Sequence, residues 1–284
     1  MAVCAASQER DSIMLKMQSP KSSQEARLSP SQGMMLIDLE GIAMIWRRDM
    51  TRLWHQRSRL LGAVARAVVW LFALGFGLRR SFVPVSGLTY EQFVFPGIIA
   101  MTIIFSGLQS AISIVYDREF GFLKEVLVAP TPRSTLVIGK CLGGASSATI
   151  QAAIVFLFAP FAAVHLTLVN VSLTLITMFI TALAVSALGV IIAISISDFE
   201  NFGTFQNFIT LPLYMFSGAI FPTNGVPAWL HVILLINPLT YGVDAIRGTL
   251  LGYNLGNVPF DCVMLLTFTI VLVAIAIALA GREM

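Results

Sequence analysis

Residues 141–197 read CLGGASSATIQAAIVFLFAPFAAVHLTLVNVSLTLITMFITALAVSALGVIIAISIS and contain no Asp, Glu, Lys or Arg. A helix rises about 1.5 Å per residue, so about 20 apolar residues cross the hydrocarbon core of a membrane. The stretch is therefore long enough for two spans, with the AVHLT sequence around His165 as the predicted hairpin. Both spans are predicted to be helices, because an isolated strand would leave backbone groups unpaired in lipid.

The composition of the whole chain excludes an ordinary soluble domain. Of its 284 residues, 57% are hydrophobic and only 12% are charged, whereas a soluble domain carries about 25% charged residues. So much apolar surface needs lipid as its solvent. We therefore predict an all-α membrane protein with six transmembrane helices. These spans are expected near residues 60–78, 93–115, 142–164, 168–196, 202–221 and 260–280.

The segment before the first span divides into two parts. Residues 1–34 are rich in Ser, Gln, Pro and charge without periodicity, which predicts disorder, and Met34 or Met35 could be the true start. No signal peptide is visible, so the first span is expected to stay in the chain. Residues 35–57 repeat apolar side chains at steps of three and four, which predicts an amphipathic helix. The apolar stripe comprises Met35, Leu39, Ile42, Trp46, Met50 and Leu53.

This amphipathic helix is expected to lie in the cytoplasmic interface of the membrane. Its apolar stripe would face lipid, and its arginines would lie among anionic headgroups. The alternative is a cytosolic helix that packs on the protein's own loops.

Lys and Arg are concentrated on one side of the predicted spans. Residues 1–59 hold nine of them and the loop at 116–134 adds three, whereas the opposite side has only Arg79, Arg80 and Arg247. Because cytoplasmic loops carry the excess of Lys and Arg, both termini and the loop at 116–134 are predicted to be cytoplasmic.

This cytoplasmic loop begins with a charged stretch, YDREFGFLKEVLVAPTPR, at residues 116–133. Glu119–Val128 could form a short helix with Phe120, Leu123 and Leu127 on its apolar side, ended by the prolines that follow. Such a helix can dock on a soluble partner, because apolar anchors give affinity and charges set the register. A solvated loop with balanced charge is the alternative that the residues leave open.

Three motifs in this chain occur together in one order. They are FPGIIAMTIIFSGLQSAISIVYDREFGFLKEVLVAPTPRSTLVIGK (95–140), LPLYMFSGAIFP (211–222) and INPLTYGVDAIRG (236–248). Together they resemble the permease subunits of bacterial ABC-type exporters, the class that includes nodulation-factor, polysaccharide and daunorubicin-type drug exporters. The resemblance runs from about residue 40 to the C-terminus.

The resemblance implies a function in ATP-driven export from the cytoplasm, in a multi-pass protein of the bacterial cytoplasmic (inner) membrane. It implies a separate ATP-binding subunit that holds ATP and magnesium, and a second permease subunit that completes a homodimer. No cofactor is expected in this chain itself. The charged loop would contain the coupling helix that seats in the ATPase. Its residues would be Asp117, Arg118, Glu119, Phe120, Gly121, Leu123, Lys124 and Glu125.

The resemblance also implies a re-entrant helix pair at residues 226–250, before the last span. The residues support this independently, since Trp229–Ile236 is too short to cross a membrane and Asn237–Pro238 interrupts it. The residues assigned to this outer element are Asn237, Pro238, Tyr241, Asp244 and Arg247.

Few polar side chains are predicted inside the spans. Arg66 either snorkels to the inner headgroups or contacts an anionic substrate head or a carboxylate at the subunit interface. The amides could line a path, or they could simply hydrogen-bond between helices. The broadly apolar spans suit an amphipathic, lipid-linked or drug-like substrate without choosing among these. The residues assigned to a possible translocation path are Arg66, Gln109, Gln151, Gln206 and Asn207.

The sequence offers no motif for ATP hydrolysis. A phosphate-binding loop has Gly, four residues and then Gly-Lys-Ser/Thr, but Gly139–Lys140 is followed by Cys141 and position 134 is Ser. The ATPase would therefore be another polypeptide.

Other functional classes receive little support from the residues. The three histidines are isolated and the three cysteines lack metal spacing, so no catalytic residue and no metal site is predicted. No nucleic-acid partner is expected either. The main alternative function is an ion-coupled transporter or channel, which the lack of carboxylates inside spans two to five disfavours. A membrane scaffold is a more distant alternative.

Overall fold

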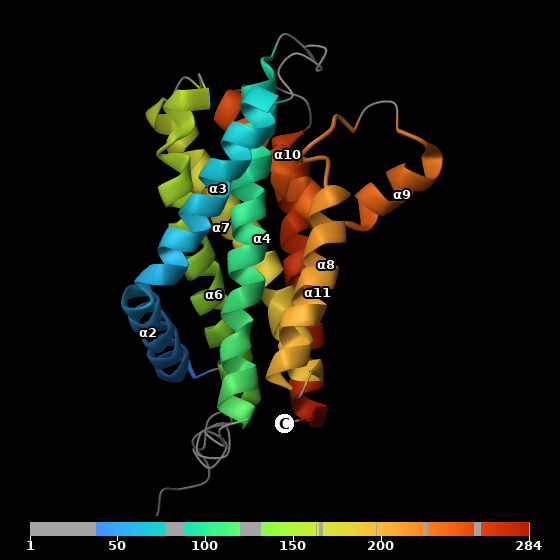
Figure 1. Cartoon of the computed structure of the whole chain (residues 1–284). Coiled ribbons are helices and arrows are strands. Elements are labelled where there is room, and N and C mark those ends of the chain that lie inside the picture. The colour runs from blue at the N-terminus through green and yellow to red at the C-terminus, as the bar shows by residue number, and fades with distance from the viewer. Residues whose placement is uncertain are drawn as a thin grey trace, which may run out of the picture. The chain divides into compact units, whose positions relative to one another are not determined.

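The computed structural model describes residues 38–77, 88–119, 132–162, 164, 167–196, 198–223, 226–252 and 257–283. Every regular element within these ranges is a helix, which confirms the predicted all-α class. Residues 1–34, for which disorder was predicted, lie outside them. The elements are α2 (Leu39–His55), α3 (Arg57–Gly77), α4 (Tyr90–Glu119), α6 (Arg133–Phe156), the 3-10 helix η1 (Ala159–Ala162), α7 (Leu168–Ser195), α8 (Phe199–Met215), α9 (Ala228–Ile236), α10 (Pro238–Leu251) and α11 (Val258–Glu283) (Figure 1).

Four of these helices, α3, α4, α7 and α11, are long and apolar enough to cross a membrane. The short helices α9 and α10 meet the same test only as a pair, which is bent by 84° between Ile236 and Pro238. The chain is therefore a multi-pass membrane protein. Helices α6 and α8 overlap the third and fifth predicted spans but are not among the four, and α8 has only 17 residues.

Helix α6 differs in its limits from the span predicted at 142–164, because it occupies Arg133–Phe156. A proline ring clashes with the carbonyl group four residues earlier in a helix, so Pro160 prevents the helix from continuing beyond Phe156. The chain turns there and forms η1. Helix α7, by contrast, ends within one residue of its predicted limits, 168–196.

Helix α4 lies at the centre of the bundle, where it packs on both α6 and α7, and these two helices also pack on each other. Within its most apolar window 78% of residues are buried, compared with 17% in α3 and in α11. Glycines allow the central helices to approach closely: an added Cβ would lie 2.9 Å from Val185 at Gly107 and 2.9 Å from Ser186 at Gly144. The apolar outer faces of α3 and α11 are left to contact lipid or another chain.

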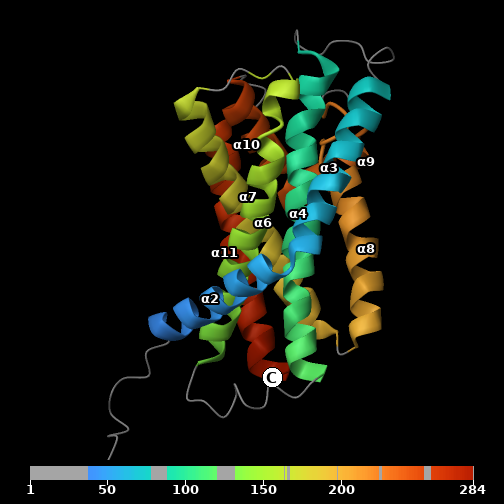
Figure 2. The same ribbon diagram turned by 60° about the vertical axis from the view of Figure 1, so that its left-hand side comes forward.

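Helix α2 is inclined steeply to the long helices in the lower half of the molecule (Figure 2) and packs on α6. Its contact surface on α6 is a row of small residues. An added Cβ at Gly139 would lie 3.0 Å from Ile45, and one at Gly143 would lie 2.7 Å from Asp49. Helix α2 therefore depends on these two glycines for its position against the bundle.

The predicted apolar stripe of α2 is divided between two environments. Ile42 and Leu53 are buried, whereas Leu39 is 73% and Trp46 is 42% exposed. The buried face centres on Asp49 rather than on the stripe, because that carboxylate has a buried partner in α6. The helix therefore combines packing on the protein's own helices with an exposed apolar edge.

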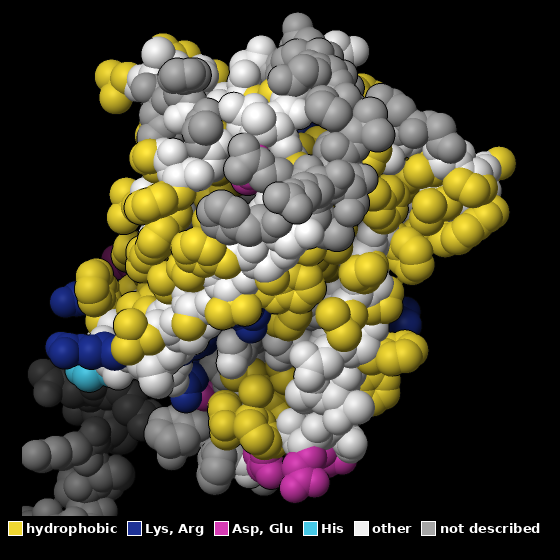
Figure 3. Space-filling model, turned by 45° about the horizontal axis from the view of Figure 1, so that its top comes forward, with side chains coloured by type: hydrophobic (Ala, Val, Ile, Leu, Met, Phe, Trp, Pro, Cys, Tyr) yellow, Lys and Arg dark blue, Asp and Glu magenta, His cyan; other side chains and the backbone are white. Residues whose placement is uncertain are grey.

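The surface of the molecule reflects this arrangement. Hydrophobic side chains cover the middle of the molecule and the projecting α9 in Figure 3, and most visible Lys, Arg, Asp and Glu side chains lie toward the lower end. This end carries α2 and the C-terminal ends of α4 and α7 (Figure 1).

Candidate functional site

A cluster of charged side chains joins α2, α4 and α6 at the lower end of the bundle. Lys140 Nζ lies 3.2 Å from Asp49 Oδ1 and 3.5 Å from Asp117 Oδ2, and it donates a 2.8 Å hydrogen bond to Ser113 Oγ. Arg48 Nη2 donates to Asp117 Oδ2 at 2.7 Å. These five residues are called the Lys140 cluster below. They tie α2 to both central helices at the residue where the predicted coupling segment begins.

Burial makes the Lys140 cluster a strong constraint on structure. The side chains of Lys140 and Asp49 are only 2% and 7% exposed. A buried charge without a partner is costly, so Lys140 and Asp49 each require the other to stay in place. The cluster was not predicted from the sequence. The available signal was Lys140 itself, a lone cation one residue before the long charge-free stretch.

The predicted coupling residues are only partly within the described ranges. Asp117, Arg118 and Glu119 form the last residues of α4. Arg118 Nη1 donates to the carbonyl oxygen of Ile194 at 3.0 Å, which fixes this end of α4 to the end of α7. Five other residues assigned to the coupling segment lie outside the described ranges: Phe120, Gly121, Leu123, Lys124 and Glu125.

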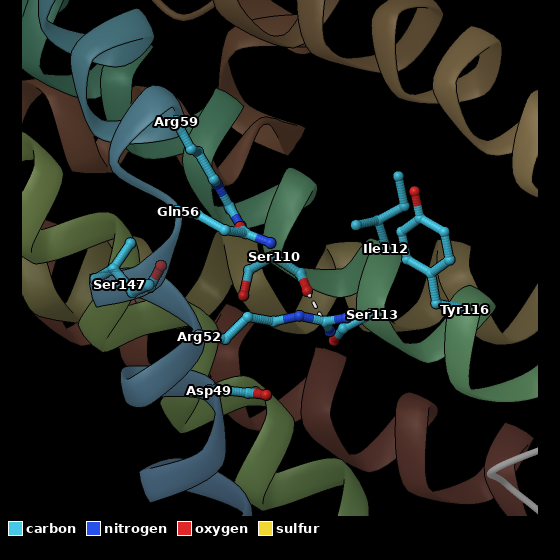
Figure 4. A pocket seen from close by; sticks show the side chains of 10 residues that line it. Asp49, Arg52, Gln56, Arg59, Ser110, Ile112, Ser113, Tyr116 and Ser147 are labelled. Atoms are coloured by element: carbon cyan, nitrogen blue, oxygen red, sulfur yellow. Dashed lines mark hydrogen bonds between the residues drawn. The ribbon is translucent and has the colours of Figure 1, made fainter.

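Two neighbouring cavities open beside this cluster, where α2 meets α3. The smaller, of about 50 Å³, is drawn in Figure 4, with Arg52 of α2 directed toward Ser113 and with Gln56 and Arg59 directed toward Ser110. The larger, of about 500 Å³, shares Gln56 and Arg59 with it. The larger cavity is lined by Gln56, Ser58, Arg59, Gly62, Ala63, Arg66 and Gln109.

The larger cavity brings together two residues of the predicted translocation path, Arg66 and Gln109. The other three lie elsewhere. Gln151 is buried in α6, where its Oε1 accepts from Ser106 Oγ at 2.9 Å, so it joins two helices. On α8, Gln206 is buried and Asn207 is exposed.

The residues predicted for the outer element connect α10 with its neighbours. Asn237 caps α10 by accepting from the Leu239 N–H at 3.0 Å. Its Nδ2 donates to the carbonyl oxygens of Leu213 and Phe216 at 2.7 and 2.9 Å. Pro238 is the first residue of α10, a position that needs no N–H donor.

The remaining outer residues also have specific partners. Tyr241 donates through its hydroxyl to the carbonyl oxygen of Leu235 at 2.9 Å, which closes the bend between α9 and α10. Arg247 pairs with Asp244 at 3.0 Å, donates to the Gly218 carbonyl oxygen at 3.0 Å and lies 4.1 Å from the centre of the Phe93 ring. Arg247 is therefore a buried internal residue and not a loop cation.

Among the described residues, no group of three or more His, Cys, Asp and Glu side chains is placed to hold a metal ion. The Lys140 cluster is held by ion pairs, and the larger cavity offers polar side chains for binding.

Comparison with known proteins assigns this arrangement to a family. The model of the ABC-2 type transporter family matches residues 40–251, which is well over half of the chain. Nodulation protein J of Rhizobium leguminosarum bv. viciae is 26% identical over 245 residues, covering 84% of this chain and 93% of that protein. The inner membrane transport permease YadH of Escherichia coli K12 is 26% identical over 250 residues, covering 85% of this chain and 93% of that protein.

A third relative, the putative transport permease ycf38 of Cyanophora paradoxa, is 25% identical over 213 residues, with 74% of this chain and 73% of that protein covered. The match to the family model, by contrast, extends from α2 to α10, so it includes both the Lys140 cluster and the larger cavity. The chain belongs to the ABC-2 type transporter family and is a transmembrane transport permease.

Proposed function

We propose that this chain is the permease subunit of an ATP-driven exporter, in which a separate subunit hydrolyses ATP. Members of the ABC-2 family normally work with an ATP-binding subunit. The observation that carries the proposal is the position of the Lys140 cluster, which fixes α4 to α2 and α6 at Asp117, the first residue of the coupling segment. A force applied to that segment would therefore move three helices together.

The mechanism that we propose needs no bond chemistry from this chain. ATP and magnesium bind to a pair of ATPases, which close on each other and displace the coupling segments of two permease chains. Helix α4 is one continuous helix from Tyr90 to Glu119, so it would transmit this displacement along the bundle. The translocation path would lie between the two permease chains, and the cargo would be amphipathic, lipid-linked or drug-like.

The main alternative, an ion-coupled transporter, would need titratable groups along its path. In the described part of the helices, Asp244 is paired with Arg247 and Asp261 lies in the first turn of α11, at one end of the bundle. Neither residue is therefore a free carboxylate in the middle of a span. This supports an external energy source.

Purification from native membranes in mild detergent tests this proposal. A C-terminally tagged permease should recover a second polypeptide with a phosphate-binding loop, in about equal amount. An ion-coupled transporter would be recovered with no ATPase, and this result would reject the proposal.

The orientation and the number of spans form part of the proposal. Helices α6 and α8 would be the third and fifth spans, and α9 and α10 would turn back within the outer leaflet. The 84° bend between α9 and α10 supports this arrangement, because it departs far from a single straight span. Both termini would then lie in the cytoplasm, in a bacterial inner membrane, with α2 at the interface.

Cysteine labelling should confirm the orientation. A cysteine at Ser134, at the start of α6, should react with a membrane-impermeant thiol reagent only in opened cells. A cysteine at Ser86, between α3 and α4, should react in intact cells whose outer membrane is permeable. Reaction of Ser134→Cys in intact cells would reverse the proposed orientation.

A reporter fused to the C-terminus should distinguish a re-entrant pair from a crossing one. If α9 and α10 turn back, the C-terminus is cytoplasmic, and alkaline phosphatase fused there should be inactive while green fluorescent protein fluoresces. If the pair crosses as one bent span, the opposite pattern would be observed.

A further inference from the structure

The larger cavity has an unusual balance of charge for a site beside a membrane-spanning helix. Two of its lining residues, Arg59 and Arg66, are cations, and none is an acid. Among the residues that line the neighbouring smaller cavity, the carboxylate belongs to Asp49, which is already paired with Lys140 at 3.2 Å. The larger cavity is therefore positively charged and has no anion of its own to balance that charge.

Several donors in this cavity have no partner in the described part of the chain. Arg66 makes no hydrogen bond or ion pair there and only covers the Phe105 ring, 4.4 Å from its centre. Arg59 donates through Nη2 to the Ser106 carbonyl oxygen at 3.0 Å, but its buried Nε has no acceptor. The cavity can thus offer several N–H donors to a ligand, and its missing component is an acceptor with negative charge.

The fold continues this cavity into an apolar surface. Arg66 follows Arg59 by seven residues, so the two lie on one face of α3 about 10 Å apart along its axis. Farther along the helix on nearly the same face, Val69 and Ala73 are exposed. A ligand with a charged head and an apolar chain would fit this order, with the head at the arginines and the chain along α3.

We propose that the larger cavity binds the phosphate group of an anionic lipid from the inner leaflet. Arg59 and Arg66 would donate to the phosphate oxygens, with Gln56 and Gln109 as further donors, and the acyl chain would lie along Val69 and Ala73. Arginine suits this role because its planar guanidinium can donate to two phosphate oxygens at once. The assignment to the inner leaflet rests on the orientation proposed above.

Photolabelling in lipid nanodiscs tests this site. The full-length permease, without any ATPase or ATP, is placed in phosphatidylcholine nanodiscs that contain a photoreactive phosphatidylglycerol. Labelling should be saturable, should map to α3 or the adjoining part of α4, and should be displaced by unlabelled phosphatidylglycerol. Because a charged hydrogen bond is lost with each arginine, Arg59→Gln and Arg66→Gln should each weaken binding about tenfold.

Two further variants keep the test independent of folding. Gln109→Glu adds a carboxylate to the cavity at an exposed position and should reduce labelling without removing an arginine. Arg47→Gln removes an exposed arginine of α2 that lines neither cavity, and labelling should stay unchanged.

Equal labelling of the wild type, Arg66→Gln and Gln109→Glu would overturn the proposal. So would displacement of the label by inorganic phosphate as efficiently as by phosphatidylglycerol, since the ligand would then be a free anion. Because no ATPase takes part, this test can fail while ATP-driven transport is correct, and it can succeed while that function is wrong.

Discussion

Lys140→Met is expected to destabilise the permease strongly. The substitution keeps most of the side-chain volume but leaves the carboxylate of Asp49 buried without its cation and weakens the contact of α2 with α6. Breaking a buried ion pair by removing one partner typically costs about 3–5 kcal/mol. Heating the detergent-purified protein and measuring the remaining monodisperse fraction by gel filtration should show a lower unfolding temperature. The control Arg47→Met, at an exposed position of α2, the helix that carries Asp49, should cause little change.

A second substitution separates loss of the ion pair from loss of packing. Lys140→Met combined with Asp49→Asn leaves no unpaired charge at this position, while Asp117 keeps its 2.7 Å contact with Arg48. The double variant should recover most of the lost stability, because replacing a whole buried pair costs far less than breaking it. If Lys140→Met alone is as stable as the wild type, the cluster does not hold α2 on the bundle.

Phe120→Ala combined with Leu123→Ala is expected to release the ATPase. These residues form the predicted apolar side of the coupling helix, which follows the last described residues of α4. Truncating a buried interface anchor costs on the order of 2 kcal/mol or more, which weakens association at least about tenfold. The measurement is the amount of ATPase recovered per tagged permease, together with the rate of ATP hydrolysis by the recovered complex.

Matched variants show whether such a loss is specific to the coupling segment. Phe161→Ala removes an exposed aromatic side chain in η1, which follows the C-terminal end of α6, and should leave recovery unchanged. Glu125→Lys should reduce recovery more at low than at high salt, because exposed charges are screened by salt. Full recovery with the double alanine variant at normal membrane insertion would make the segment a solvated connector.

The sequence predicted most reliably those features that depend on local composition. Helix α7 ends at Ser195, close to residue 197, where the charge-free apolar run ends. The bend between α9 and α10 occurs at Asn237 and Pro238. The Asn237 side chain caps α10, and Pro238, which has no backbone N–H, cannot continue α9. Helix α6 was harder to predict, since the apolar run continues past Phe156 while Pro160 ends the helix.

Features that depend on long-range pairing could not be predicted in the same way. Lys140 meets Asp49 from 91 residues away and Ser113 from 27 residues away, and hydrophobic periodicity carries no information on such pairs. The apolar stripe of α2 was expected to face lipid, and the periodicity gave no sign that two of its members, Ile42 and Leu53, are buried in the protein. The true position of α2 follows from Gly139 and Gly143, which admit Ile45 and Asp49 to close contact with α6.

Photo-crosslinking from position 120 tests the central claim most directly. The full-length permease carries a photoreactive benzoylphenylalanine at Phe120, or at the control position Phe161, and is irradiated in its native membrane. The account predicts one adduct from position 120 whose second component is a polypeptide with a phosphate-binding loop, and no such adduct from position 161. A permease that is inserted normally, is recovered with its ATPase, and gives no ATPase adduct from position 120 would contradict the account.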